Sequence, residues 1–191
     1  MQSISRNKKP YEPHVSVKRE KQLNERKNVK LFKSVCLALA LDVTATSFAI
    51  AQNFEKGLEA YDTVDFTTAL QNWRLLAEQG DVHAQYNLGW LYQQRDGVPQ
   101  DYAEAISWYR KAAEQGFAWA QNNLGLMYEQ GVGIPQDYAV AHMWYNLADA
   151  NGLEDAADYR DNVAKQMTPQ DISRAQALAS ECLNSNYENC G

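Results

Sequence analysis

Few residues in this 191-residue chain have the types and spacing that catalysis or metal binding requires. A Ser-x-x-Lys spacing, typical of a serine nucleophile with a lysine base, occurs at Ser5 and Lys8, ahead of a targeting-like segment, and is attributed to chance. His83 and His142 have no second metal ligand at helical spacing, and His83, just ahead of a helix, is expected to be exposed. The segment Gly131–Gly133 is followed by no lysine and preceded by no strand, so it predicts a turn rather than a phosphate site. We therefore expect a protein that is not an enzyme and that carries neither metal nor cofactor.

Two cysteines, Cys182 and Cys190, lie close together near the C-terminus, and they are the only ones after residue 51. A disulfide between them would close a short loop and stabilise the fold by about 2.5 kcal/mol in the chain-entropy estimate. Such a bond persists in an oxidising compartment, whereas in the cytosol the pair would remain isolated thiols. We expect the disulfide, because no histidine or further cysteine nearby completes a metal site.

Charge is divided sharply along the chain. Residues 1–51 carry ten Lys/Arg and four Asp/Glu, whereas residues 52–191 carry eight Lys/Arg and twenty Asp/Glu. The second part lacks the basic stripe that neutralises phosphates, which excludes nucleic acid as an expected partner. The acidic residues are spread out rather than clustered, and solubility is a sufficient explanation for them.

Residues 29–51 have the features of a signal peptide. Lysines precede an apolar stretch from Val35 to Leu41, and Ala49-Ile50-Ala51 fits the small-x-small rule for cleavage before Gln52. Asp42 interrupts the apolar stretch, and a charge there costs a spanning helix about 2.5–3.5 kcal/mol, which argues against a permanent anchor. We expect a periplasmic or secreted protein with no stable membrane span after processing.

Residues 1–28 are too long and too polar for an ordinary start of a signal peptide. One hypothesis is that translation begins at Val29 and that the upstream stretch is not made. The alternative is a cytosolic basic tail ahead of an uncleaved anchor.

A fixed period organises the rest of the chain. Eighteen of the thirty-six residues in 84–119 recur identically thirty-six positions later, in 120–155. A period of this length predicts stacked pairs of helices in which each pair buries the apolar face of its neighbour. Residues 54–80 align as an atypical half repeat, which an end unit is expected to be.

Each repeat predicts two antiparallel helices joined by a loop that contains glycine and proline. Gly89 lies within the first helix of its repeat, where glycine costs about 1 kcal/mol of helix stability relative to alanine. We therefore expect that Gly89 is there for packing and lets the second helix approach closely. Asp101 is a suitable N-cap for the second helix, and Gly116 would end it. The core of the repeats is predicted from recurring aromatic residues, which are Trp108, Tyr109, Trp144 and Tyr145.

Residues 153–191 lose the period and predict two capping helices. The first spans about 153–166, and the second begins after the N-cap Thr168 and runs to about Leu183. We expect an all-α, right-handed α/α solenoid of about two and a half repeats, at 52–152, with this C-terminal helical cap.

The repeated pattern is Ala-x-x-x-Leu-Gly-x-x-Tyr, Gly-Val-Pro-x-Asp-Tyr-x-x-Ala and Trp-Tyr-x-x-Ala-Ala-Glu-Gln-Gly, and it resembles the Sel1-like repeat. This family is related to the tetratricopeptide repeat. The resemblance covers residues 54–152 and departs from the pattern at 149–151. It implies a solenoid whose concave face binds a protein or peptide, often in an exported bacterial protein of the envelope.

Two further functions come with the resemblance. One exported, cysteine-rich branch of the family is described as binding or cleaving β-lactams. Members of that branch have a disulfide in every repeat, and this chain does not. A regulatory subunit of an envelope enzyme complex is the other alternative.

The predicted binding residues are expected to face away from the core, and they either differ between the repeats or offer amides. They are Tyr86, Asn87, Trp90, Asn122, Asn123 and Leu126. Asparagine amides can hydrogen-bond an extended peptide backbone, and Trp90 can serve as an anchor. The alternative for Trp90 is that it packs against the neighbouring helix.

Overall fold

The computed structural model describes residues 43–187 and 190, with only the backbone for residues 43–52. The chain divides into two units, residues 1–46 and 47–191, and the account below concerns the second. The predicted extension 1–28 and most of the signal segment therefore lie outside the described residues. The predicted cleavage site between Ala51 and Gln52 falls inside a described helix.

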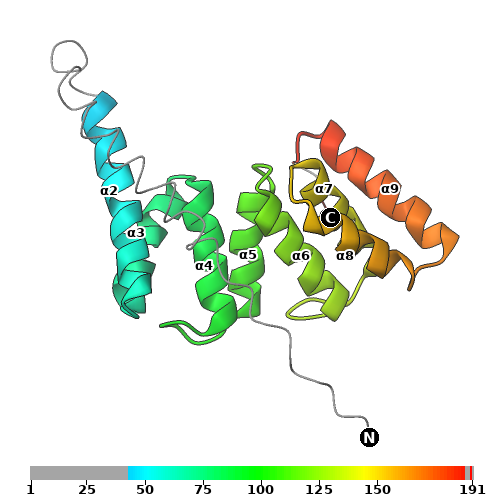
Figure 1. Ribbon diagram of the computed structural model, residues 1–191, viewed down its shortest axis with the longest axis horizontal. Coiled ribbons are helices and arrows are strands. Elements are labelled where there is room, and N and C mark those ends of the chain that lie inside the picture. Colours follow the sequence, from blue (N-terminus) through cyan, green and yellow to red (C-terminus); the bar gives the residue numbers. More distant parts are fainter. Residues whose placement is uncertain (1–42, 188–189, 191) are drawn as a thin grey trace, which may run out of the picture. The chain divides into compact units, whose positions relative to one another are not determined.

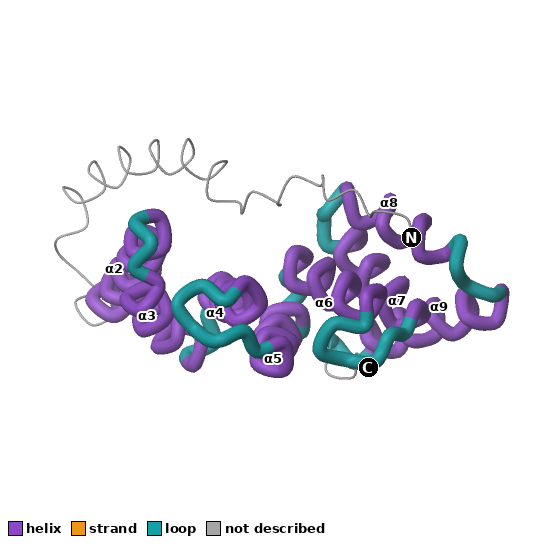
Figure 2. Tube along the Cα trace, turned by 90° about the horizontal axis from the view of Figure 1, so that it is seen from below, coloured by secondary structure: helices purple, strands orange, loops and turns teal. Residues whose placement is uncertain are grey.

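Helices joined by short loops make up the described part of the chain, and no strand occurs in it (Figures 1 and 2). The helices are α2 (Val43–Asp62), α3 (Phe66–Glu78), α4 (Val82–Gln94), α5 (Tyr102–Ala113), α6 (Ala118–Gln130), α7 (Tyr138–Ala150), α8 (Asp155–Ala164) and α9 (Pro169–Asn184). The fold class is all-α, as predicted. None of the described helices is long and apolar enough to cross a membrane.

The helix ends follow the sequence signals closely. Asp101 accepts hydrogen bonds from the backbone N–H groups of Ala103 and Glu104, both at 3.0 Å, and so caps α5 as predicted. At the other end of α5, the N–H of Gly116 donates to the carbonyl of Ala113 at 2.9 Å, and the next N–H donates one residue further back. This pair of bonds is a Schellman motif, and it needs the positive φ of +78° that Gly116 adopts.

The close approach predicted for Gly89 is present. A Cβ on Gly89 would lie 2.6 Å from the ring of Tyr109, so the glycine is required for α4 and α5 to pack together. Gly125 has the same relation to Tyr145 between α6 and α7. The recurring aromatic residues that predicted the core are all buried, and they are Trp108, Tyr109, Trp144 and Tyr145.

The two C-terminal helices both pack on α7 and bury it almost completely (Figure 1). Thr168 and Asp171 form a capping box that starts α9, where the sequence predicted a helix. Arg174 of α9 then donates to Asp137 at 2.8 Å, and Asp137 is the N-cap of α7. The same carboxylate thus begins α7 and fastens α9 to it.

Candidate interaction surface

Two helices in the middle of the chain carry almost no charge. The thirteen residues of α4 include no Asp, Glu, Lys or Arg, and the thirteen of α6 include only Glu129. Apart from Glu129, their partly exposed side chains are amide, aromatic or aliphatic. We give the name α4–α6 face to seven of them, which are His83, Asn87, Trp90, Trp119, Asn122, Asn123 and Leu126.

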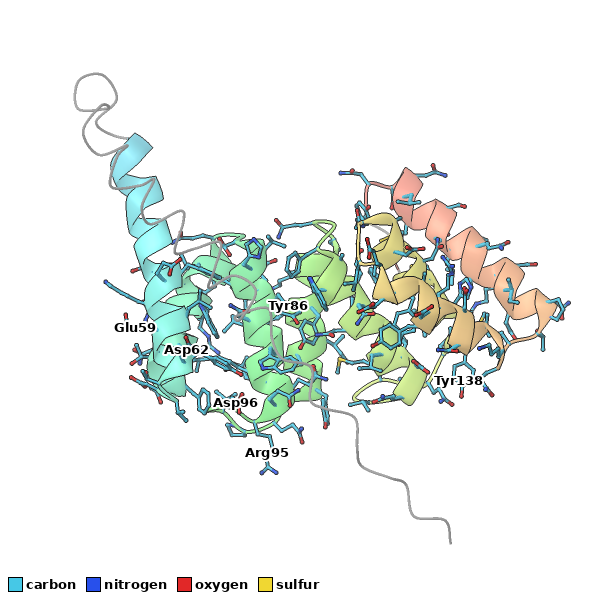
Figure 3. The ribbon with its side chains drawn as sticks, in the orientation of Figure 1. Glu59, Asp62, Tyr86, Arg95, Asp96 and Tyr138 are labelled. Atoms are coloured by element: carbon cyan, nitrogen blue, oxygen red, sulfur yellow. A yellow bond between two sulfur atoms is a disulfide. The ribbon has the colours of Figure 1, made fainter. Side chains whose placement is uncertain are left out.

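Five of the six predicted binding residues belong to this face. Asn87, Trp90, Asn122, Asn123 and Leu126 are all half-buried. Tyr86 differs from the expectation that it faces away from the core, because it is only 9% exposed. Its ring packs against Tyr109 and Phe117, at centroid distances of 5.7 and 5.3 Å, and Figure 3 shows it among the helices of the repeat.

Trp90 is held by the preceding helix pair. Its indole N–H donates to the hydroxyl of Tyr61 at 2.9 Å, and that hydroxyl donates to Asp96 at 3.2 Å. Asp96 lies in the connection after α4, beside the end of α2 (Figure 3). Burial raises the pKa of the Tyr61 phenol, and the nearby Asp96 carboxylate raises it further, so the phenol stays neutral. The indole ring is thus fixed in position while its face stays half-exposed.

The two asparagines of α6 have unused hydrogen-bonding capacity. Oδ1 of Asn122 and Nδ2 of Asn123 are buried atoms that find no hydrogen-bond partner among the described residues. An unmet buried polar atom costs about 1–3 kcal/mol, and these two atoms are too deeply buried for a ligand to reach unless the side chains turn. Both residues are half-buried, so it is the remaining accessible part of each amide that can contact a peptide backbone.

His83 is less exposed than the sequence predicts. Its ring packs edge-on against Phe117 at 5.1 Å and lies 6.0 Å from the ring of Phe54. Phe117 stands at the N-cap of α6 and forms no side-chain cap hydrogen bond, whereas Asp81 caps α4. A missing cap costs about 1 kcal/mol, and the aromatic contacts of Phe117 take its place.

A ladder of buried amides, which the sequence analysis missed, fixes the spacing of the repeats. Gln121 is fully buried, and its Nε2 donates to the carbonyl of Ala113 at 3.0 Å. Its Oε1 accepts from Asn151 at 2.9 Å. Gln85 makes the equivalent pair of bonds one repeat earlier, with Ala77 and Gln115. The recurrence of glutamine at 85 and 121 was the available signal.

The predicted disulfide joins Cys182 to Cys190, with a Cα–Cα distance of 4.6 Å. Tyr187 lies inside the loop that it closes, and its hydroxyl is 3.1 Å from Nδ2 of Asn151. Asn151 stands where the family pattern has glutamine. It therefore connects the disulfide loop to the buried amide of Gln121.

No group of side chains in the described residues has the composition of a metal site. His142 is buried on α7, and burial lowers its pKa, with the charge of Arg160 lowering it further. A neutral, buried histidine without neighbouring ligands is part of the packing. Tyr145 is buried against Glu129, which accepts its hydroxyl at 2.6 Å, and burial raises its pKa far above the ordinary value.

Capped helix pairs, glycine-mediated packing and the amide ladder at a thirty-six-residue period define an α/α repeat protein. The model of the Sel1 repeat matches residues 48–81, 82–117 and 120–152, together more than half of the chain. The chain therefore belongs to the Sel1 repeat family. The match gives three repeats rather than the two and a half predicted, because α2 and α3 count as a full repeat despite their short connection.

Two solved structures are similar to this chain. One is c5321, a protective antigen present in uropathogenic Escherichia coli strains that displays an SLR fold, with a TM-score of 0.68 and 28% identity over 72% of this chain and 31% of that one. This chain thus spans about a third of its length. The other is a Sel1 repeat protein from Oxalobacter formigenes, with a TM-score of 0.56 and 34% identity over 64% of this chain and 95% of that one. No curated protein matched.

Proposed function

We propose that this chain is a non-enzymatic adaptor of the bacterial envelope that binds a protein or peptide along the α4–α6 face. Proteins with Sel1 repeats are generally protein-interaction scaffolds. The observation that carries the proposal is the uncharged, half-exposed face of α4 and α6, in a part of the chain that is otherwise strongly acidic. A face that only had to be solvated would carry charges like the remaining surface.

The face suits an extended chain because amides recur at repeat spacing. Asn87 and Asn123 occupy equivalent positions on α4 and α6. Their side chains can each donate to and accept from a peptide unit, while Trp90 and Leu126 offer apolar contacts beside them.

Export is part of the proposal and rests on separate support. The signal-like segment ends before Gln52, and the Cys182–Cys190 disulfide suits an oxidising compartment. Mass spectrometry of the N-terminal peptide of the protein isolated from the native envelope should give Gln52, free or cyclised to pyroglutamate, as its first residue. Recovery of the unprocessed chain from the cytosol would contradict export and leave the interaction face untouched.

Site-specific crosslinking tests the interaction. A photoreactive amino acid placed at Asn87 or Asn123 should capture one defined protein in living cells, identified by mass spectrometry. Ser107 on α5 and Ser180 on α9 are exposed control positions away from the face. Capture of the same protein from the control positions, or of none from Asn87 and Asn123, would refute binding on this face.

A further inference from the structure

The helix α8 continues the register of α4 and α6, although the family match stops at residue 152. Ala84, Ala120 and Ala156 are spaced by thirty-six residues, and all three are fully buried. About two helical turns further along the same face, Met127 and Val163 are also thirty-six residues apart, and both are 1% exposed. The same sides of the three helices therefore face the core.

Because the register continues, the outward residues of α8 extend the α4–α6 face. Asp155 is equivalent to Trp119, Asp158 to Asn122 and Tyr159 to Asn123. Both aspartates are exposed, and Tyr159 is 42% exposed while its ring stacks on Tyr145 at 5.6 Å. The surface thus changes from uncharged on α4 and α6 to acidic on α8.

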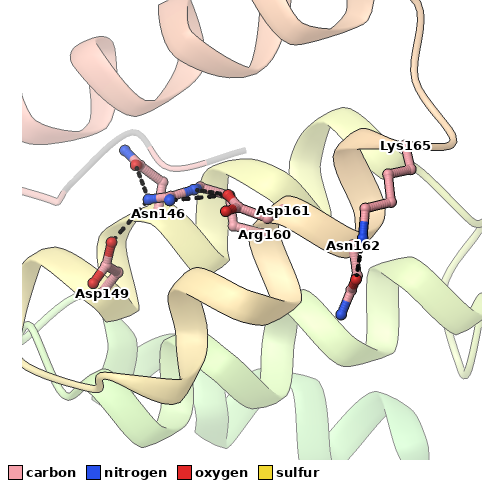
Figure 4. Close-up of polar contacts among 6 residues, drawn as sticks. All are labelled: Asn146, Asp149, Arg160, Asp161, Asn162 and Lys165. Carbon is pink, nitrogen blue, oxygen red and sulfur yellow. Dashed lines mark hydrogen bonds and ion pairs between the residues drawn. The ribbon is translucent and has the colours of Figure 1, made fainter.

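The acidic residues at this end have no neutralising partner of their own among the described residues. Arg160, the only cation within α8, donates to Asp149 at 2.8 Å and to Asp161 at 3.0 Å (Figure 4). Asp155 and Asp158 take part in no ion pair in the described part of the chain. A cation brought by a ligand would meet two carboxylates whose charge is not already used.

We propose that the partner is an extended protein segment with an uncharged part followed by a basic part, and this proposal rests on the proposed function. Its uncharged residues lie along α4 and α6, and its lysine or arginine side chains lie against Asp155 and Asp158 of α8. Charge complementarity selects a basic rather than an acidic segment, and the excess of twenty Asp/Glu over eight Lys/Arg in residues 52–191 adds long-range attraction.

Three labelled peptides with a common uncharged core of alanine, leucine and glutamine test this chemistry. They end in two lysines, two glutamines or two glutamates, and their binding to the full chain is followed by fluorescence anisotropy at low and high salt. Exposed ion pairs contribute 0.2–1 kcal/mol each, so the lysine peptide should bind about two- to thirtyfold more tightly than the glutamine peptide. The glutamate peptide should bind most weakly, and high salt should reduce the differences.

The double variant Asp155→Asn/Asp158→Asn should remove most of the preference for lysine over glutamine. The matched control is Glu104→Gln/Glu181→Gln, which removes the same charge from exposed sites on α5 and α9 and should keep the preference. Glu104 lies in the first turn of its helix, as Asp155 and Asp158 do, so the control matches the helix-dipole effect at this one position; Glu181, in the last turn of α9, matches the change in charge only. The single variant Asp158→Asn, measured in parallel, gives a smaller loss if the double variant does not fold.

A lysine preference that persists in the Asp155 and Asp158 variants would overturn the assignment of the basic residues to α8. Equal binding of the three peptides, or no binding of any, would overturn the proposed partner chemistry. Neither result bears on crosslinking from Asn87, which decides the proposed function independently.

Discussion

Replacement of Gly125 by alanine sets two effects of opposite sign against each other. Alanine favours a helix over glycine by about 1 kcal/mol, so an isolated α6 would gain stability. In the folded chain, however, the new Cβ would lie 2.7 Å from two carbons of the Tyr145 ring. That ring is fully buried, and its hydroxyl is fixed by Glu129, so it has little freedom to move away.

Overpacking of this kind costs about 1–3 kcal/mol, and it should outweigh the gain in helix propensity. We therefore expect Gly125→Ala to lower the free energy of unfolding by up to about 2 kcal/mol, measured by urea denaturation with tryptophan fluorescence. Gly89→Ala should behave alike, because Tyr109 stands in the same place. In a Tyr145→Leu background the ring is absent, and Gly125→Ala should become neutral or stabilising. Stabilisation of the wild-type chain by Gly125→Ala would refute the close-packing argument.

Three further changes probe the ladder, the disulfide and the cap of α7. Gln121→Leu should destabilise by about 1–3 kcal/mol in urea, since it removes two hydrogen bonds, one to the Ala113 carbonyl and one from Asn151, of about 0.5–1.5 kcal/mol each. Cys182→Ala/Cys190→Ala should lose about 2.5 kcal/mol, and a reducing agent should destabilise the wild type but not the variant. Burial raises the pKa of Asp137, but hydrogen bonds from Arg174 and two backbone N–H groups outweigh it and hold that pKa below its ordinary value. The Asp137 carboxylate therefore stops stabilising the fold as the pH falls through this lowered folded-state pKa. Asp137→Asn should flatten the decline in urea stability below about pH 4. A decline as steep as that of the wild type would contradict the stabilising role of the carboxylate.

The sequence predicts the helices and their ends well because those signals are local. Asp101, Gly116 and Thr168 act on backbone groups within four residues of themselves, so residue type and spacing suffice to place them. The recurring aromatic residues predict the core for a related reason. A residue type kept at the same place in two copies meets the same neighbours in both.

The half-exposed face could be predicted only in part because it depends on contacts between repeats. Tyr86 was expected to face outward, but Phe117 at the N-cap of α6 covers it. His83 is covered by the same ring, which stands at the N-cap of α6. The amide ladder had a visible signal in Gln85 and Gln121, yet spacing alone does not say that these side chains point inward.

The repeats separate two kinds of constraint, and this separation is what points to a ligand. Positions that pack against a neighbouring helix keep their residue type from copy to copy, as Ala84, Ala120 and Ala156 do. Outward positions of the same helices change, from Trp119 on α6 to Asp155 on α8. Packing does not require these differences, and solvation alone does not explain why charge is missing from α4 and α6 and appears on α8. A ligand that crosses the helices in one direction would account for both observations, since each helix would then meet a different part of it.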